Sequence, residues 1–166
     1  MKLLLTSAGI TNQTILQGLD ELVGKPLDQL KVAFIPTAAN LEPGDKGWLI
    51  DDLRRLSFLK FKEIDIVDIS ALFQKVWQPR LENADVLFVE GGNTYHLMYW
   101  FNKSGLSKIL SKLLETKIYI GVSAGTIITT PSLINADFEA KPLKEIHEEI
   151  FNDGLNLVNF MVEPHL

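Results

Sequence analysis

The sequence predicts an α/β protein with a doubly wound, mostly parallel sheet flanked by helices, which is a three-layer sandwich. Short apolar runs alternate with amphipathic stretches along the chain, in the β-α-β order that produces parallel strands. Three of these runs, 3–5, 86–89 and 118–122, are apolar throughout, as in strands buried on both faces. No repeat or linker divides the 166 residues, so we expect one domain over 1–166.

The first half of the chain supplies three of the strands. In order, we expect a strand at 2–7, a helix at 13–24, a strand at 31–37, a helix at 47–59 and a strand at 61–69. Gly24 suits the C-cap of the first helix, and Pro36 ends the second strand. Leu49, Leu53 and Leu56 recur at helical spacing, so they form one apolar face of the second helix.

The second half continues the alternation. The expected elements are a short helical piece at 74–84, a strand at 85–92, helices at 94–102 and 106–115, and a strand at 117–123. Pro79 is expected to interrupt the first of them, because proline lacks the N–H that a helix interior uses. The apolar run before Pro164 and His165 is expected to form a short final strand.

Composition excludes several classes of function. The net charge is −5 and no block of Lys or Arg occurs, which argues against nucleic acid or an anionic membrane as the main partner. The chain has no cysteine, so disulfides, zinc–thiolate sites and a cysteine nucleophile are excluded. No run has the roughly 18 apolar residues of a membrane helix, and the N-terminus lacks the apolar core of a signal peptide. We therefore expect a cytoplasmic protein.

Small residues follow four of the predicted strands. They occur in the segments Ser7-Ala8-Gly9, Thr37-Ala38-Ala39-Asn40, Glu90-Gly91-Gly92-Asn93-Thr94 and Ser123-Ala124-Gly125-Thr126. Open α/β sheets bind ligands outside the carboxyl ends of their strands. Small side chains there let backbone amides approach a substrate closely. We therefore expect the functional site at this edge of the sheet.

The segment Gly121-Val122-Ser123-Ala124-Gly125 fits the G-x-S-x-G nucleophile elbow. A sharp strand-to-helix turn strains the serine backbone, so the residues two positions away must be small, and the next helix aims its N–H groups at an oxyanion. The simpler interpretation is a turn with small residues for packing. Ser7 has Leu5 where the elbow needs glycine, so its loop is expected to line the site.

Gly91 and Gly92 form the second feature of the expected site. The N–H of one of them, together with the N–H of Ala124, would form an oxyanion hole. The simpler interpretation is a glycine turn followed by a helix that Asn93 or Thr94 caps.

A serine nucleophile needs a base, and the chain has three histidines. His96 lies in an apolar helix, where a structural role is expected, and His147 lies in a charged stretch, where solvent exposure is expected. His147-Glu148 is followed by Phe151 where a zinc HExxH motif needs histidine. His165, after the last apolar run, is the best base by position.

The acid that orients the base must be a carboxylate. Asp137 follows Ser123 by 14 residues, and Glu139 and Glu163 are its rivals.

These features together resemble the peptidase E family, which are aspartyl dipeptidases of serine peptidase family S51 related to cyanophycinases. The resemblance covers nearly the whole chain and is carried by Gly121–Gly125, Glu90–Thr94 and Pro164-His165, with "LLLTS" and "FIPTAA" at the first two strand ends. It implies the flavodoxin-like fold of the class I glutamine amidotransferase domain.

The resemblance also implies roles for single residues. Ser123 is the nucleophile, His165 is the general base, and Asp137 is the third member of the triad, with Glu139 as the alternative because the loop is slightly short. Gly92 and Ala124 supply the oxyanion-hole amides. The implied reaction cleaves dipeptides or short peptides after an N-terminal aspartate through an acyl-enzyme, without a metal or an organic cofactor. No arginine for the aspartate side chain can be named from the sequence.

One departure from the family pattern concerns the C-terminus. Family members continue past the catalytic histidine, whereas this chain has one residue after His165, so it is expected to lack the family's C-terminal strand and helix. The alternative function is therefore a non-catalytic or weakly active binding domain on the same fold. The apolar stretch 155–162 would favour self-association, with a homodimer as the expected form.

Two other enzyme classes rank lower. An esterase of the α/β-hydrolase type shares the elbow, but it usually places more strands after its nucleophile than the 43 residues beyond Ser123 allow. A glutamine amidotransferase requires a cysteine nucleophile, and the chain has none.

Overall fold

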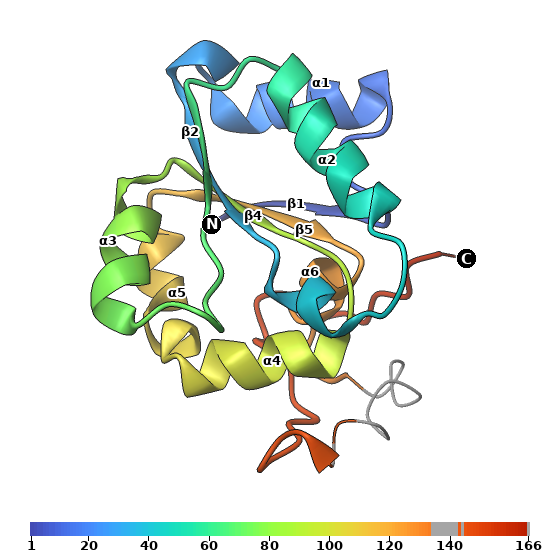
Figure 1. Cartoon of the computed structure of the whole chain (residues 1–166). Coiled ribbons are helices and arrows are strands. Elements are labelled where there is room, and N and C mark those ends of the chain that lie inside the picture. Colours follow the sequence, from blue (N-terminus) through green and yellow to red (C-terminus); the bar gives the residue numbers. More distant parts are fainter. Residues whose placement is uncertain (134–142, 144, 166) are drawn as a thin grey trace.

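The protein is built on a five-stranded sheet in which every pair of neighbouring strands is parallel (Figure 1). The computed structural model describes residues 1–133, 143 and 145–165. The strands are β1 (Lys2–Thr6), β2 (Lys31–Ile35), β3 (Glu63–Ile66), β4 (Val86–Val89) and β5 (Ile118–Val122). They lie in the order β1-β5-β4-β2-β3, so the predicted doubly wound α/β fold is confirmed.

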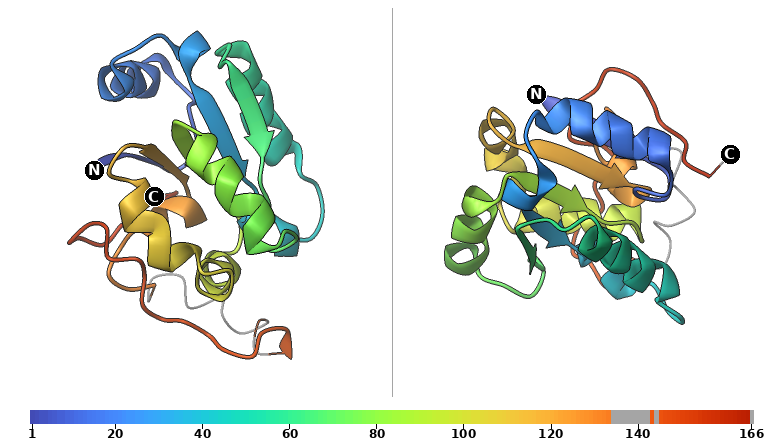
Figure 2. Two further views of the ribbon diagram at one scale, coloured as in Figure 1. Left: turned by 90° about the vertical axis from the view of Figure 1, so that its left-hand side faces the viewer. Right: turned by 90° about the horizontal axis from the view of Figure 1, so that it is seen from above.

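Helices cover both faces of the sheet (Figure 2). The α-helices are α1 (Gln13–Val23), α2 (Gly47–Phe58), α3 (Gln74–Asn83), α4 (Thr94–Lys103), α5 (Leu106–Leu113) and α6 (Ala124–Ile127), and the 3₁₀ turns are η1 (Leu27–Gln29) and η2 (Thr37–Leu41). Side chains of α1 and α2 join one apolar cluster, while those of α3, α4 and α5 join the other. Alternate residues of each inner strand point into the two clusters, as the period of a β-strand requires.

The inner strands match the prediction from apolar runs, and the first strand does not. Every residue of β4 and β5 is buried. The leucines of β1 are only half-buried, because β1 forms an edge of the described sheet and pairs with β5 alone. A run of leucines therefore indicates a strand here without indicating its place in the sheet.

Two predicted local features, an interruption at Pro79 and a final strand before Pro164, are absent from the described structure. Pro79 lies inside α3, which continues because Trp77 and Leu81 anchor the helix in the core. The expected final strand is wrong: the run before Pro164 forms bends, with Phe160 and Met161 exposed. The nearest β-pairing is an isolated antiparallel bridge between Ser132 and Asp153.

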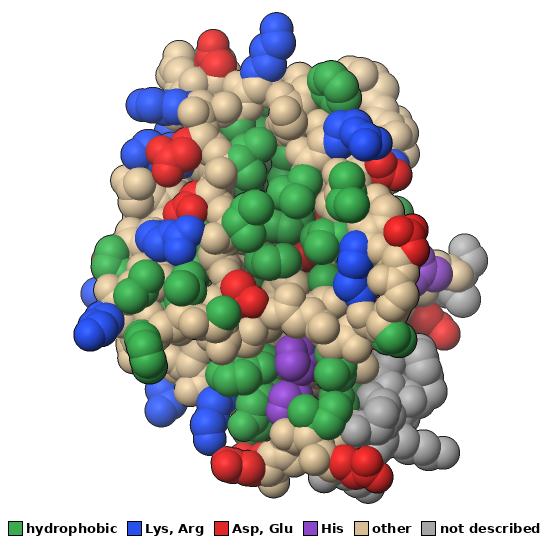
Figure 3. Space-filling model, viewed as in Figure 1, with side chains coloured by type: hydrophobic (Ala, Val, Ile, Leu, Met, Phe, Trp, Pro, Cys, Tyr) green, Lys and Arg blue, Asp and Glu red, His purple; other side chains and the backbone are tan. Residues whose placement is uncertain are grey.

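One face of the molecule has hydrophobic side chains gathered near α2 and the edge strand β3 (Figure 3). Phe58 of α2 and Ile66 of β3 are among the exposed large hydrophobic residues. In the described ranges, no helix has the length and apolar character needed to cross a membrane.

Candidate active site

Ser123 occupies a strained turn between β5 and α6. Its backbone has φ +47° and ψ −106°, a conformation that L-residues other than glycine seldom adopt. A Cβ at Gly121 would lie 2.7 Å from the carbonyl oxygen of Gly125, and a Cβ at Gly125 would lie 2.1 Å from the carbonyl oxygen of Val89. Backbone atoms of other residues thus lie too close to both glycines of the G-x-S-x-G pattern for either position to carry a side chain.

Buried hydrogen bonds hold this turn against β1. The Ser123 N–H donates to the carbonyl of Thr6 over 3.0 Å. The Thr126 hydroxyl also donates to the Thr6 carbonyl, over 2.8 Å, and accepts from the Thr6 N–H over 3.1 Å. The Tyr119 hydroxyl donates to the Gly125 carbonyl over 2.6 Å. Burial raises the pKa of Tyr119, so this hydroxyl keeps its proton and the turn keeps its support.

His165 lies beside Ser123. Its Nε2 is 2.9 Å from the Ser123 Oγ, although the two residues are 42 positions apart in the chain. The ring comes from the C-terminal segment and is exposed, with the backbone at φ +70°. The structure thus brings together the serine and the histidine that the sequence singled out.

The Gly91–Gly92 turn lies next to this pair. A Cβ at Gly91 would meet the Ser123 Cβ at 3.3 Å, and Gly92 has φ +129° with the Ala38 backbone 2.4 Å from where a Cβ would lie. The Gly91 N–H donates to the Glu90 Oε1 over 2.9 Å, so it is already engaged.

The cap of α4 is confirmed. The Asn93 side chain accepts a hydrogen bond from the His96 N–H over 2.9 Å.

A cleft of about 730 Å³ opens over Ser123. Its walls come from the ends of β1, β4 and β5, from α2 and the loop before it, and from the C-terminal segment; they include Ser7, Ala8, Thr11, Glu42, Pro43, Trp48, Asp51, Asp52, Arg55, Glu90, Gly91, Gly92, Asn93, Val122, Ser123 and His165. The loop at Ser7 lines the site, as expected. Sequence reasoning missed Asp52 and Arg55, whose i, i+3 spacing on a helix is the only signal that could have paired them.

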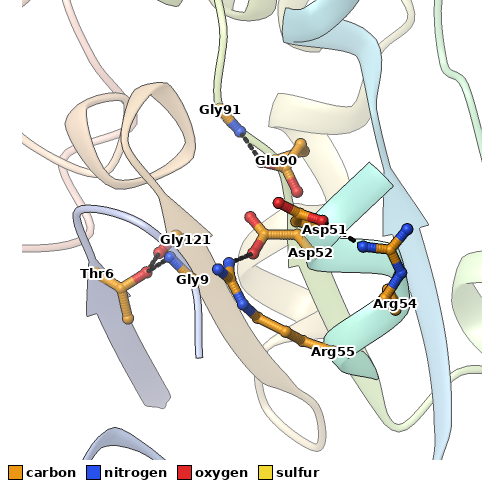
Figure 4. A network of polar contacts seen from close by, with 9 residues as sticks. All are labelled: Thr6, Gly9, Asp51, Asp52, Arg54, Arg55, Glu90, Gly91 and Gly121. Carbon is orange, nitrogen blue, oxygen red and sulfur yellow. Dashed lines mark hydrogen bonds and ion pairs between the residues drawn. The ribbon is translucent and has the colours of Figure 1, made fainter. Parts of the chain in front are cut away.

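Charged groups meet in one wall of the cleft (Figure 4). Arg55 donates to the Asp52 carboxylate over 2.7 Å. Asp52 and Glu90 are both buried, and their side chains lie close to each other (Figure 4). Burial first, and the charge of Asp52 second, raise the pKa of Glu90 to about 8. Burial also raises the pKa of Asp52, against the lowering effect of Arg55.

The other two histidines lie together, away from the lining of this cleft. The His96 Nδ1 is 2.8 Å from the His147 Nε2, and the His147 ring stacks on Tyr99 with ring centres 3.9 Å apart. His147 is only 9% exposed, so the prediction that it is solvated was wrong. The cause is that His96 and Tyr99, one helical turn apart on α4, bury it. Burial lowers the pKa of His96 to about 4.

The contacts described above do not include the carboxylate that was predicted to orient His165. Asp137 and Glu139 lie outside the described residues. Glu163 is described and exposed. Among residues 1–133, 143 and 145–165, no group of three or more His, Asp or Glu side chains is arranged to hold a metal ion.

A parallel α/β sheet that carries a serine at a strained elbow, with a histidine in contact, has the architecture of a serine hydrolase. The chain belongs to peptidase family S51, whose sequence model matches residues 3–166.

Named relatives agree with this family. An uncharacterized peptidase of Listeria innocua is 39% identical over 143 residues, covering 81% of this chain and 63% of its own length. A peptidase E of Shewanella oneidensis is 32% identical over 146 residues, covering 85% of this chain and 56% of its own length. The chain spans less than two thirds of the length of these relatives.

Solved structures agree on the fold. A 1.5 Å crystal structure from Listeria monocytogenes EGD-e, of a protein provisionally named peptidase E, superposes with a TM-score of 0.84 at 29% identity and covers 100% of this chain and 80% of that one. A peptidase from an acI-B1 Actinobacterium superposes with a TM-score of 0.67 over 98% of this chain and 67% of its own, and at 17% identity it supports the fold alone.

Proposed function

We propose that the protein is a serine peptidase that cleaves dipeptides or short peptides after an N-terminal aspartate through an acyl-enzyme. The observation that carries this proposal is the 2.9 Å contact between the Ser123 Oγ and the His165 Nε2 at the strained elbow. Membership of peptidase family S51 supports the same chemistry.

In the proposed reaction, the Ser123 Oγ attacks the carbonyl carbon of the first residue while its proton passes to the His165 Nε2. The N–H groups of Gly92 and Ala124 stabilise the oxyanion. His165 then donates the proton to the leaving amine as the C–N bond breaks, which leaves an ester on Ser123. Water, deprotonated by His165, hydrolyses that ester and releases the N-terminal residue.

This cycle requires one particular tautomer of His165. The Nε2 must be unprotonated to accept the serine proton, so the Nδ1 must carry the hydrogen and donate it to the orienting acid. We propose Asp137 for that acid, with Glu139 as the alternative. Both residues lie outside the described part of the chain.

The preference for aspartate is supported by Arg55. This arginine is among the cleft-lining residues, and its side chain is 43% exposed although one N–H already binds Asp52. Guanidinium presents five donors, so other N–H groups remain for a substrate carboxylate. The nearby carboxylates of Glu42 and Asp51 suit the free α-ammonium group of a short peptide. Together they fit a small substrate that carries both charges.

The test is hydrolysis of aspartyl p-nitroanilide by the wild-type chain and by Ser123→Ala. We expect turnover by the wild type and a loss of about 10⁴-fold or more in the variant. Ser57→Ala, a change at an exposed serine of α2, is the matched control and should keep full turnover. Alanyl p-nitroanilide tests the charge preference, because its turnover should be far lower. Equal turnover by wild type and Ser123→Ala would reject the proposal.

A further inference from the structure

Glu90 is a buried acid directly under the proposed active site. It follows β4, has no exposed surface, and its backbone N–H donates to the Ile35 carbonyl over 3.0 Å. Its Oε1 accepts from the Gly91 N–H, while its Oε2 is buried with no N–H or hydroxyl donor within the described part of the chain. The group that it faces is the Asp52 carboxyl of α2, which is itself an acceptor.

Two buried carboxyl groups in contact cannot both carry a charge at low cost. The surrounding charges decide which one ionises. Arg55 is bonded to Asp52, so the negative charge belongs on Asp52. Asp51 adds a further negative charge near Asp52, and His165 is a further titratable group that lines the cleft. A proton on Glu90 satisfies every partner: its carbonyl oxygen accepts from Gly91 and its O–H donates to Asp52.

This bridge joins the loops that shape the cleft. Figure 4 shows the Glu90 side chain directed toward α2, which carries Asp52 and Arg55. Asp52 in turn packs against Gly9 in the loop between β1 and α1, since a Cβ on that glycine would lie 2.7 Å from the Asp52 Oδ1. The Gly91 N–H is held toward the Glu90 carboxyl, which fixes the Glu90–Gly91 peptide that leads into the Gly92 amide.

We propose that Glu90 is a positioning residue that, in its protonated form, bridges the Gly91–Gly92 turn to Asp52 through one shared proton. Loss of that proton places two carboxylates face to face, so the turn shifts and the proposed oxyanion amide is misaligned. The predicted effect on turnover rests on the proposed function, whereas the predicted protonation of Glu90 does not depend on it.

Glu90→Gln is the decisive variant. A glutamine carbonyl can accept from the Gly91 N–H and its NH₂ group can donate to Asp52, which copies the protonated acid. For aspartyl p-nitroanilide, we expect the wild-type kcat to fall severalfold as pH rises through 8, and the variant to keep its near-neutral kcat there. Glu90→Ala should lower kcat at every pH. Identical pH profiles of wild type and Glu90→Gln would overturn the positioning role.

A second measurement does not depend on turnover. The infrared spectrum of the wild-type protein at neutral pH should contain a protonated-carboxyl C=O band that disappears in Glu90→Gln. Glu21→Gln, a change at an exposed acid of α1, should leave the band intact. Absence of the band from the wild type would overturn the shared proton. A protein that has the band but no turnover would keep the proton, reject the positioning role and count against the peptidase proposal.

Discussion

Single glycines set the geometry of the proposed site. Gly92 has φ +129°, and the Ala38 and Ala39 backbone leaves no room for a Cβ. Glycine is thus required at position 92 both by its positive φ and by the lack of space for a side chain. In the sequence, this requirement was visible only as a pair of adjacent glycines.

Gly92→Ala should lower the free energy of unfolding by about 3 kcal/mol, because it adds a backbone clash to the strain of positive φ. Chemical denaturation of wild type and variant measures the change. Gly44→Ala is the matched control: it also has positive φ, at +83°, but nothing lies within 4 Å of the added Cβ. It should cost only about 1 kcal/mol. Equal losses in the two variants would show that the clash is relieved.

At the scale of single residues, the sequence predicted the residues of the elbow but not the charged residues of α2 that line the cleft. Ser123, Gly92 and His165 were identifiable because each adjoins a strand end or a terminal motif. Asp52 and Arg55 lie in the interior of α2, where a pair at i, i+3 usually denotes a solvated helix face. Only the tertiary packing of α2 over Glu90 turns them into part of a cleft.

At the scale of elements, α4 is tied to the C-terminal segment by paired histidines. His96 of α4 contacts His147 over 2.8 Å, and burial together with the charge of His147 lowers the pKa of His96 to about 4. A histidine that is neutral when folded takes up its proton on unfolding, so its contribution to stability is present above pH 6.5 and is lost as pH falls toward 4.

His96→Gln should remove this dependence on pH. Relative to the variant, the wild type should lose up to about 1.4 kcal/mol of unfolding free energy per pH unit between pH 6.5 and 4. Denaturation at several pH values gives the two slopes. His165→Gln is the control, because that ring is exposed. If His96→Gln and wild type have parallel slopes, His96 is not the group responsible.

At the scale of the whole molecule, the β1-β5-β4-β2-β3 order brings the strand ends together. The alternation of apolar runs with amphipathic stretches was enough to predict the parallel sheet. It could not predict that β1 is an edge strand of the described sheet, because local sequence carries no information on strand order. The final stretch forms bends, although its apolar residues had indicated a strand.

The buried acid pair also gives the fold a dependence on pH of the opposite sign. Because the pKa of Glu90 is raised from 4.5 to about 8, its contribution to stability is fully present below about pH 4.5 and is lost as pH rises through 8. Relative to Glu90→Gln, wild-type stability should fall by up to about 1.4 kcal/mol per pH unit across that range. Thermal denaturation across the range measures it, and a constant difference between the proteins would contradict the assignment.

The central claim is that Ser123 and His165 act as one catalytic unit. The most direct measurement is kcat/KM for aspartyl p-nitroanilide in wild type, Ser123→Ala, His165→Ala and the double variant. Residues that act together lose activity non-additively, so we predict that each single variant loses about 10⁴-fold or more and the double variant loses no more than either. Losses that multiply in the double variant, or turnover that persists in Ser123→Ala, would contradict the account.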